Sequence, residues 1–140
     1  MRGWLAFPVL VLLAVAQQAP EGPFSHKKHA PLKLKCVQCH ANAEKAERAG
    51  FPSVAGCRTC HTEIAPRTIP EQRVYELRDF VIFSHARHAD SKLECANCHG
   101  NVNAMEKVEV VRSTKMASCM DCHREYKATL ECNVCHELGQ

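Results

Sequence analysis

Aromatic residues are scarce in this chain of 140 residues, which holds one tryptophan, two tyrosines and five phenylalanines. So few large rings argue against a conventional aromatic-rich core. A large excess of one charge is also absent, because 18 basic and 15 acidic residues leave a net charge of only +3. No long basic run is interleaved with aromatic residues, which excludes a nucleic-acid footprint. Charged residues at 24% and hydrophobic residues at 46% are ordinary for a globular chain and exclude disorder.

Long hydrophobic runs are limited to one, which covers 13 residues from Trp4 to Ala16. This run is shorter than the roughly 20 residues that a membrane-spanning helix needs. A basic residue precedes it, and small residues stand at the −3 and −1 positions before Gln17. We therefore expect residues 1–16 to be a signal peptide cleaved before Gln17, and residues 17–140 to be one exported domain without a membrane span. The expected location is periplasmic or extracellular.

No cysteine stands alone in the sequence, because all ten fall into five Cys-x-x-Cys pairs whose members are separated by two residues. A histidine follows the second cysteine of every pair. The five motifs are Cys36, Cys39 and His40; Cys57, Cys60 and His61; Cys95, Cys98 and His99; Cys119, Cys122 and His123; and Cys132, Cys135 and His136.

The Cys-x-x-Cys-His motif is the attachment sequence of c-type haem. Its two thiols bond the haem covalently, and the adjacent histidine becomes the proximal ligand of the iron. Zinc ribbons use cysteine pairs two at a time and need no histidine after each pair, and a disulfide framework needs none either. The sequence therefore predicts five covalently attached haems c, with every cysteine in use.

Four histidines remain outside the motifs, and all four lie in one repeated phrase. Phe24-Ser25-His26-x-x-His29-Ala30 recurs as Phe83-Ser84-His85-x-x-His88-Ala89, at an offset of 59 that continues through the next haem motif. This is an internal duplication. It divides the domain into a dihaem repeat at 24–61 and a trihaem repeat at 83–136.

These four histidines are candidate sixth ligands of the irons. A lone histidine is more often a surface or satisfied core residue, but a twice-used His-x-x-His phrase is not explained that way. Low-spin iron takes a second axial ligand, which neutral imidazole supplies. The spacing of three residues puts both rings on one side of a helical turn, from which they can reach two haems.

The second half, Phe83 to His136, resembles the class III multihaem cytochromes, particularly the small trihaem members with Phe-x-His-x-x-His before Cys-x-x-Cys-His. This resemblance implies that His85 pairs with His99 and His88 with His123. Extended across the repeat, it implies that His26 pairs with His40 and His29 with His61. In that family a third distal ligand lies a few residues before the second motif and serves the last haem, and here Met116 stands in that place.

The sixth ligand of the His136 haem stays open between Met116, Met105 and an open position. Met116 matches a ligand position of the trihaem family, whereas Met105 matches none. Met120 lies inside a haem motif, on the proximal side, and is the least able to serve. A methionine that merely packs against the porphyrin is a further alternative.

The mature chain also resembles the pentahaem cytochrome subunit of quinol-oxidising complexes such as alternative complex III. Phrases that carry this likeness include Ala49-Gly50-Phe51-Pro52 before Cys57 and Met116-x-x-Cys119 in the fourth motif. The resemblance implies redox protein partners, among them a membrane quinol-oxidising complex.

The expected fold is mostly irregular with short α-helices and room for a small β-hairpin. Residues 41–49 should form a helix that ends at Gly50, and residues 73–83 and 107–111 are candidates for the hairpin. Pro66 and Pro70 mark residues 64–72 as a linker. Five haems on 124 mature residues leave about 25 residues each, so the haems themselves should form the core.

The expected function is electron relay between redox partners, without enzymatic activity, because a saturated iron has no position for substrate. Two alternatives remain. One is a multihaem reductase with an open iron at the His136 haem, and the other is a subunit of a membrane quinol-oxidising complex.

Overall fold

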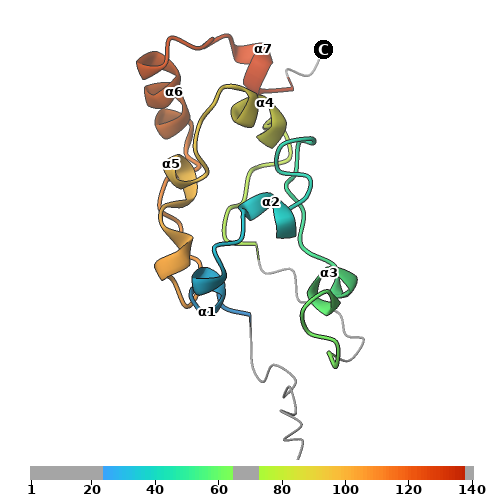
Figure 1. Cartoon of the computed structure of the whole chain (residues 1–140). Helices are drawn as coiled ribbons and strands as arrows, with labels where there is room; N and C mark the ends of the chain where they lie inside the picture. Colours follow the sequence, from blue (N-terminus) through green and yellow to red (C-terminus); the bar gives the residue numbers. More distant parts are fainter. Residues whose placement is uncertain (1–23, 65–72, 138–140) are drawn as a thin grey trace, which may run out of the picture.

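The computed structural model describes residues 24–64 and 73–137, and the predicted signal peptide and most of the predicted linker lie outside them. Its elements are short helices joined by irregular segments (Figure 1). In chain order they are α1 (His26–His29), η1 (Ala30–Leu32), α2 (Cys36–Cys39), α3 (Val54–Arg58), α4 (His85–Asp90), α5 (Ala96–His99), η2 (Val102–Ala104), α6 (Met116–Glu125) and α7 (Cys132–Cys135). The prediction of a mostly irregular chain with short helices is confirmed.

The two repeats build the same local structure at the same places. α1 and α4 both begin after a serine whose side-chain oxygen accepts a backbone N–H, from Lys28 at Ser25 and from Arg87 at Ser84. Such a cap satisfies one of the free donors of the first turn. A lysine in the left-handed region follows each helix, with φ of 52° at Lys33 and 58° at Lys92. The duplication seen in the sequence is therefore also a duplication of backbone conformation.

Most of the haem motifs lie on short helices. α2 and α7 each span one cysteine pair from end to end, and α6 contains the pair of the fourth motif. α5 begins one residue after Cys95, which caps it in a helical conformation. In a helix, residues three apart share a face, so the two thiols of such a motif lie on one side. This local geometry presents both cysteines of a motif to one bound group.

The second motif departs from this pattern at Cys60. α3 ends at Arg58, so Cys57 lies on the helix and Cys60 lies beyond its end. The chain still turns tightly there, because the Cys60 N–H donates to the Cys57 carbonyl at 3.2 Å and the His61 N–H donates to the same carbonyl at 2.9 Å. Cys60 is thus placed by a turn and not by a continuous helix.

The predicted helix over residues 41–49 is wrong, because this segment forms turns and bends. Its carbonyl groups bond elsewhere: Ala46 accepts the N–H of Ala86, and Glu47 accepts the N–H of His85. These two carbonyls thus accept hydrogen bonds from α4 and not from a helix of their own segment. Tertiary hydrogen bonds override the helix propensity of its Ala, Glu and Lys residues.

The predicted hairpin between residues 73–83 and 107–111 is not formed either. The described residues hold no strand, and an isolated antiparallel bridge joins Val81 to His136. Residue 111 meets residue 75 through a side chain, since the Val111 N–H donates to the Tyr75 hydroxyl at 2.9 Å. That hydroxyl donates to the carbonyl of Cys98 at 2.9 Å. Tyr75 therefore ties two segments to a haem motif without a strand ladder.

The polypeptide supplies almost no core of its own. Among the described residues, Ile64 is the one buried hydrophobic side chain and Ser25 the one buried polar residue. Large apolar residues such as Phe24, Phe80 and Leu32 are exposed. A chain of this size that packs so little apolar surface needs other sources of stability, such as metal ligation and covalent cofactors.

Candidate haem-binding site

All ten cysteine thiols are free in the described part of the chain, and all belong to the five motifs. Within the same residues, no three or more His, Cys, Asp or Glu side chains gather as a metal cluster would require. A tetrahedral zinc site needs four such ligands together. The arrangement of the motifs therefore gives no support to the zinc interpretation.

Each motif has one exposed and one half-buried thiol. The exposed cysteines are Cys36, Cys60, Cys95, Cys119 and Cys132, and the half-buried cysteines are Cys39, Cys57, Cys98, Cys122 and Cys135. Attachment of haem to these ten thiols stays a prediction.

Cys60 differs from the second cysteine of every other motif in its exposure to solvent. In the other four motifs the first cysteine is exposed and the second is half-buried, but here Cys57 is half-buried and Cys60 is exposed. The Cys60 sulfur lies 3.8 Å from the Thr59 hydroxyl oxygen, and that hydroxyl already donates to the Gly56 carbonyl at 2.8 Å. This reversal follows from the end of α3 before Cys60, which replaces the helical turn that carries both thiols elsewhere.

The four histidines outside the motifs each face a motif histidine. The ring centres lie 6.3 Å apart for His26 and His40, and 6.4 Å apart for His85 and His99. They lie 6.0 Å apart for His29 and His61, and 6.2 Å apart for His88 and His123. The structure thus brings together the four pairs that the resemblance implied.

These separations suit one metal ion between two imidazoles. Metal–imidazole bonds are about 2.0 Å long, and each nitrogen lies about 1.1 Å from its ring centre, so two opposed ligands have centres about 6.2 Å apart. The donor set, two thiols and two facing imidazoles per site, fits a covalently attached haem at four of the five motifs.

The ring planes divide the pairs into two kinds. His26 and His40 are inclined by 13°, and His85 and His99 by 6°, so both pairs are nearly parallel. The outer pairs are rotated, by 71° for His29 and His61 and by 47° for the pair formed by His88 and His123. The first pair of each repeat is therefore nearly parallel in both repeats, whereas the second pair is rotated in both by different angles.

Backbone carbonyls fix the tautomer of several of these rings. The Nδ1 atoms of His29 and His88 lie 2.9 Å and 2.8 Å from the carbonyl oxygens of Ser25 and Ser84. Because a carbonyl can only accept, Nδ1 carries the proton, and Nε2 keeps the lone pair that binds a metal. The same arrangement holds for three further rings, at His40 with Gly50, His85 with Glu47 and His123 with Thr129.

Burial lowers the pKa of two of the facing histidine rings. Desolvation, followed by the nearby charges of His40 and His29, lowers the pKa of His26. Desolvation, followed by the charges of His85 and His40, lowers the pKa of His99. Neutral imidazole is the form that binds metal, so these environments favour ligation.

Aromatic side chains pack against the histidine rings, a role that the sequence analysis did not predict for them. Phe24 stacks on His29 with centres 4.7 Å apart and meets His26 edge-on at 4.8 Å. Phe83 repeats this arrangement with His88, at 4.5 Å, and with His85. The phenylalanine that opens the repeated phrase therefore orients both distal histidines, and its recurrence was the available signal.

Two further aromatic residues were missed because no repeat marked them. Tyr75 meets the His99 ring edge-on at 4.8 Å, with the planes inclined by 82°. Phe80 lies 5.8 Å from the ring of His136. Both residues come from the segment between the repeats, where the sequence offered only a weak strand pattern.

The His136 site differs from the other four. Within the residues that the structure describes, no second histidine ring faces His136, and its Nδ1 is buried without a hydrogen-bond partner. Met116 opens α6 with its side chain 59% exposed, and Met105 is half-buried. The sixth ligand of this site stays a prediction.

Burial affects the titration of several motif thiols. Desolvation raises the pKa of Cys95, and the influence of Cys36 raises it further. Desolvation, followed by the charge of Cys135, raises the pKa of Cys119. The thiol forms of these two cysteines are therefore favoured over the thiolates.

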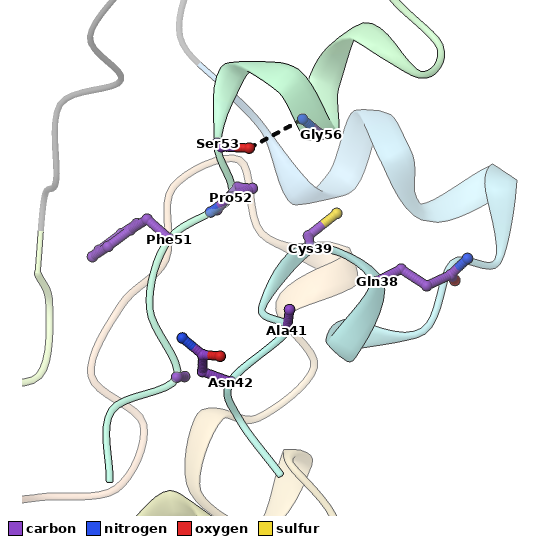
Figure 2. Close-up of a pocket in the computed structure, with 9 residues that line it drawn as sticks. Gln38, Cys39, Ala41, Asn42, Phe51, Pro52, Ser53 and Gly56 are labelled. Atoms are coloured by element: carbon purple, nitrogen blue, oxygen red, sulfur yellow. Dashed lines mark hydrogen bonds between the residues drawn. The ribbon is translucent and has the colours of Figure 1, made fainter. Parts of the chain in front are cut away.

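A pocket of about 250 Å³ lies between the first two motifs. Figure 2 shows the Cys39 side chain extending from α2 toward Ser53 and Gly56 at the start of α3. Its walls also include Phe51 and Asn42. The pocket opens space beside the Cys39 thiol of the first motif, next to the helix on which the second motif begins.

Family comparisons agree with this geometry. Residues 25–108 match the family described as cytochrome c3, and residues 81–137 match cytochrome c7 and related cytochrome c. The chain belongs to the class III multihaem c-type cytochromes. The prediction of this family from the repeated motifs is confirmed, and with it the expectation of covalently bound haem c.

A curated relative is the menaquinone reductase multiheme cytochrome c subunit of Nitratidesulfovibrio vulgaris strain Hildenborough. It is 34% identical, over 69% of this chain and 52% of the relative. The cytochrome therefore spans about half the length of the curated relative that it matches. No helix in the described residues is long and apolar enough to cross a membrane.

Proposed function

We propose that this cytochrome relays electrons between redox partners through five haems c, one at each Cys-x-x-Cys-His motif. The observation that carries the proposal is the set of four facing histidine pairs, with ring centres 6.0–6.4 Å apart. Two axial imidazoles saturate an iron and leave no position for a substrate. Such a site exchanges electrons and does little else.

The haem supplies the redox chemistry, since its iron alternates between the ferric and ferrous states. The protein holds the ligands. His40, His61, His99 and His123 are the proposed proximal ligands, and His26, His29, His85 and His88 are the proposed distal ligands in the pairs described above. Carbonyl groups orient five of these rings through Nδ1, and the phenylalanines that open each repeat brace the distal rings.

Met116 is the proposed sixth ligand of the His136 haem. It stands three residues before Cys119, so both side chains lie on one face of α6. Six residues separate the end of α6 from the start of α7, and Figure 1 shows both helices at the same end of the molecule. Thioether ligation favours ferrous iron, so this haem should have the highest potential of the five.

The test is an intact mass of the exported protein combined with its optical spectrum. Five haem additions, no free thiol and cleavage before Gln17 are expected. Fewer haems, a free thiol at Cys60, or zinc in a metal analysis would refute the proposal. Ready binding of carbon monoxide by one haem of the untreated protein would favour the reductase alternative, because it reveals an open iron.

A second candidate function is that of a subunit in a membrane quinol-oxidising complex. The curated relative, a subunit of a menaquinone reductase, favours it. In this role the cytochrome would be exported, dock on membrane partners and accept electrons from them. Co-purification of the tagged holoprotein with a quinone-reactive membrane complex tests this role, and isolation as a free monomer from gently solubilised membranes would oppose it.

A further inference from the structure

The two repeats hold each other by the same contact, made twice. The Lys27 N–H of α1 donates to the Met105 carbonyl at 3.2 Å, and the Ala86 N–H of α4 donates to the Ala46 carbonyl at 3.0 Å. Lys27 and Ala86 are equivalent across the offset of 59, and so are Ala46 and Met105. In each repeat, the helix that carries the two histidines outside the motifs (α1 or α4) thus bonds to the loop after the first haem motif of the other repeat.

The same contacts join the sites of the first and third motifs. Lys27 follows His26, which faces His40, and its N–H bonds to Met105, six residues after His99. His85, which faces His99, bonds through its N–H and its ring Nδ1 to the carbonyl of Glu47, seven residues after His40. A contact that recurs between the counterparts of both partners is the pattern of a two-fold interface, as in a symmetric dimer.

The reciprocal contact is reinforced by side chains on one side only. The Ser25 hydroxyl donates to the Glu106 carboxylate at 2.9 Å, and the Lys27 ammonium lies 3.3 Å from the same group. On the other side, Glu47 contributes its carbonyl, which accepts both the N–H and the ring Nδ1 of His85. The two contacts therefore share the same backbone hydrogen bond, and side-chain bonds to Glu106 strengthen the contact at Lys27.

From these contacts we infer that the two repeats dock as the halves of a pseudo-two-fold dimer, which makes the sites of His40 and His99 the central, adjacent pair. The haem content of these sites rests on the proposed function. α1 carries the distal ligands of the His40 and His61 sites, and α4 carries those of the His99 and His123 sites. The order of the sites is therefore His61, His40, His99 and His123, with His136 beyond.

The placement of the helices agrees with this order. In Figure 1, α3 with the second motif lies at the lower right, α2 lies in the middle, and α7 lies at the top. In the same view α5, which carries the second cysteine of the third motif, lies directly below α6, which carries the fourth motif. The His136 site extends one end of a symmetric arrangement, so the two ends of the series are chemically different.

The first test measures amide hydrogen exchange in the full-length holoprotein. First-turn N–H groups of a helix have no intrahelical acceptor, so Lys27 and Ala86 should exchange freely unless the reciprocal contacts exist. We expect both amides to exchange at least about tenfold more slowly than a free peptide group. Rapid exchange of either amide would overturn the reciprocal contact, whatever the haem count.

A matched pair of variants sharpens this test. Glu106→Ala should speed exchange at Lys27 and leave Ala86 unchanged, because the carboxylate supports one contact only. Its counterpart Glu47→Ala should change neither amide, because Glu47 acts through its backbone carbonyl. Equal effects of the two variants would contradict the assignment.

The second test is a stepwise redox titration followed by NMR, with each haem assigned. Oxidation of one haem shifts the potential of its neighbours, and the shift falls with distance. The His40 and His99 haems should shift each other more than the His61 and His99 haems do. A stronger interaction between the His61 and His99 haems would overturn the inferred order, whereas a missing haem in the mass spectrum would count against the proposed function instead.

Discussion

Removing one distal histidine should open one haem and no other. In His29→Ala the iron at His61 loses the single imidazole that faces it in the described residues, at a ring separation of 6.0 Å. The next distal ring, His26, is held against His40 at 6.3 Å and cannot serve both. About one fifth of the haem should therefore become high-spin, and about one equivalent of carbon monoxide should bind per chain.

The assay combines the optical spectrum, electron paramagnetic resonance and carbon monoxide titration of the purified holoprotein. Lys28→Ala is the matched control, because Lys28 is exposed on the same helix as His29. It should bind no carbon monoxide beyond the wild-type level. Loss of low-spin signal from more than one haem, or from a haem other than that of His61, would refute the pairing.

Three further changes test other parts of the structure. Hydrogen bonds from the Ser25 hydroxyl and then the Lys27 ammonium lower the pKa of Glu106. The stability that the Glu106 carboxylate contributes is therefore present above the ordinary pKa of 4.5 and is lost as the pH falls through the lowered pKa. Glu106→Gln should flatten the pH dependence of the unfolding free energy below pH 4.5. Gly100→Ala should cost about 1–3 kcal/mol of unfolding free energy in denaturant titrations, because φ is +64° and the new Cβ would lie 2.9 Å from Val111 Cγ2, whereas Gly56→Ala, on open helix, should cost little. Met116→His should lower the potential of one haem in a redox titration and abolish any sulfur-to-iron band, and an unchanged set of potentials would contradict Met116 ligation.

The sequence predicted the chemistry of the sites better than the path of the backbone. Motif spacing and the twice-used His-x-x-His phrase indicated the candidate ligands, and the resemblance to the trihaem cytochromes implied how they pair. The structure brings these same rings face to face. Ligand spacing is readable because a metal imposes its geometry on residue types and intervals. It needs no knowledge of packing.

Backbone predictions failed where distant segments compete for hydrogen bonds. Residues 41–49 have good helix formers, but the carbonyls of Ala46 and Glu47 accept N–H groups from α4, about 40 residues away. Tyr75 likewise replaces a strand pairing by a hydroxyl that bridges Val111 and Cys98. Local propensity is a weak guide in a chain with so little buried apolar surface, because a few long-range contacts decide each segment.

Identical motifs also hide a local difference that spacing alone does not reveal. The second motif has the same intervals as the others, yet its helix ends before Cys60 and its exposed thiol is the second of the pair. The Ser53 side chain accepts the Gly56 N–H and caps α3, which begins three residues before Cys57. α6 also begins three residues before its first cysteine but continues past both, so the early end of α3 is what sets the second motif apart.

The duplication explains why the long-range contacts are hard to see in the sequence yet simple in the structure. A repeat indicates which residues are equivalent, but not that α1 and α4 each contact the loop after the first haem motif of the other half. Once the halves are placed about a pseudo-two-fold axis, one contact implies its partner, as the bond from Lys27 implies the bond from Ala86. Symmetry alone would give a relay with identical ends. The added motif at His136, with an unpartnered Nδ1 and no facing histidine in the described residues, makes one end of the inferred series chemically unlike the other.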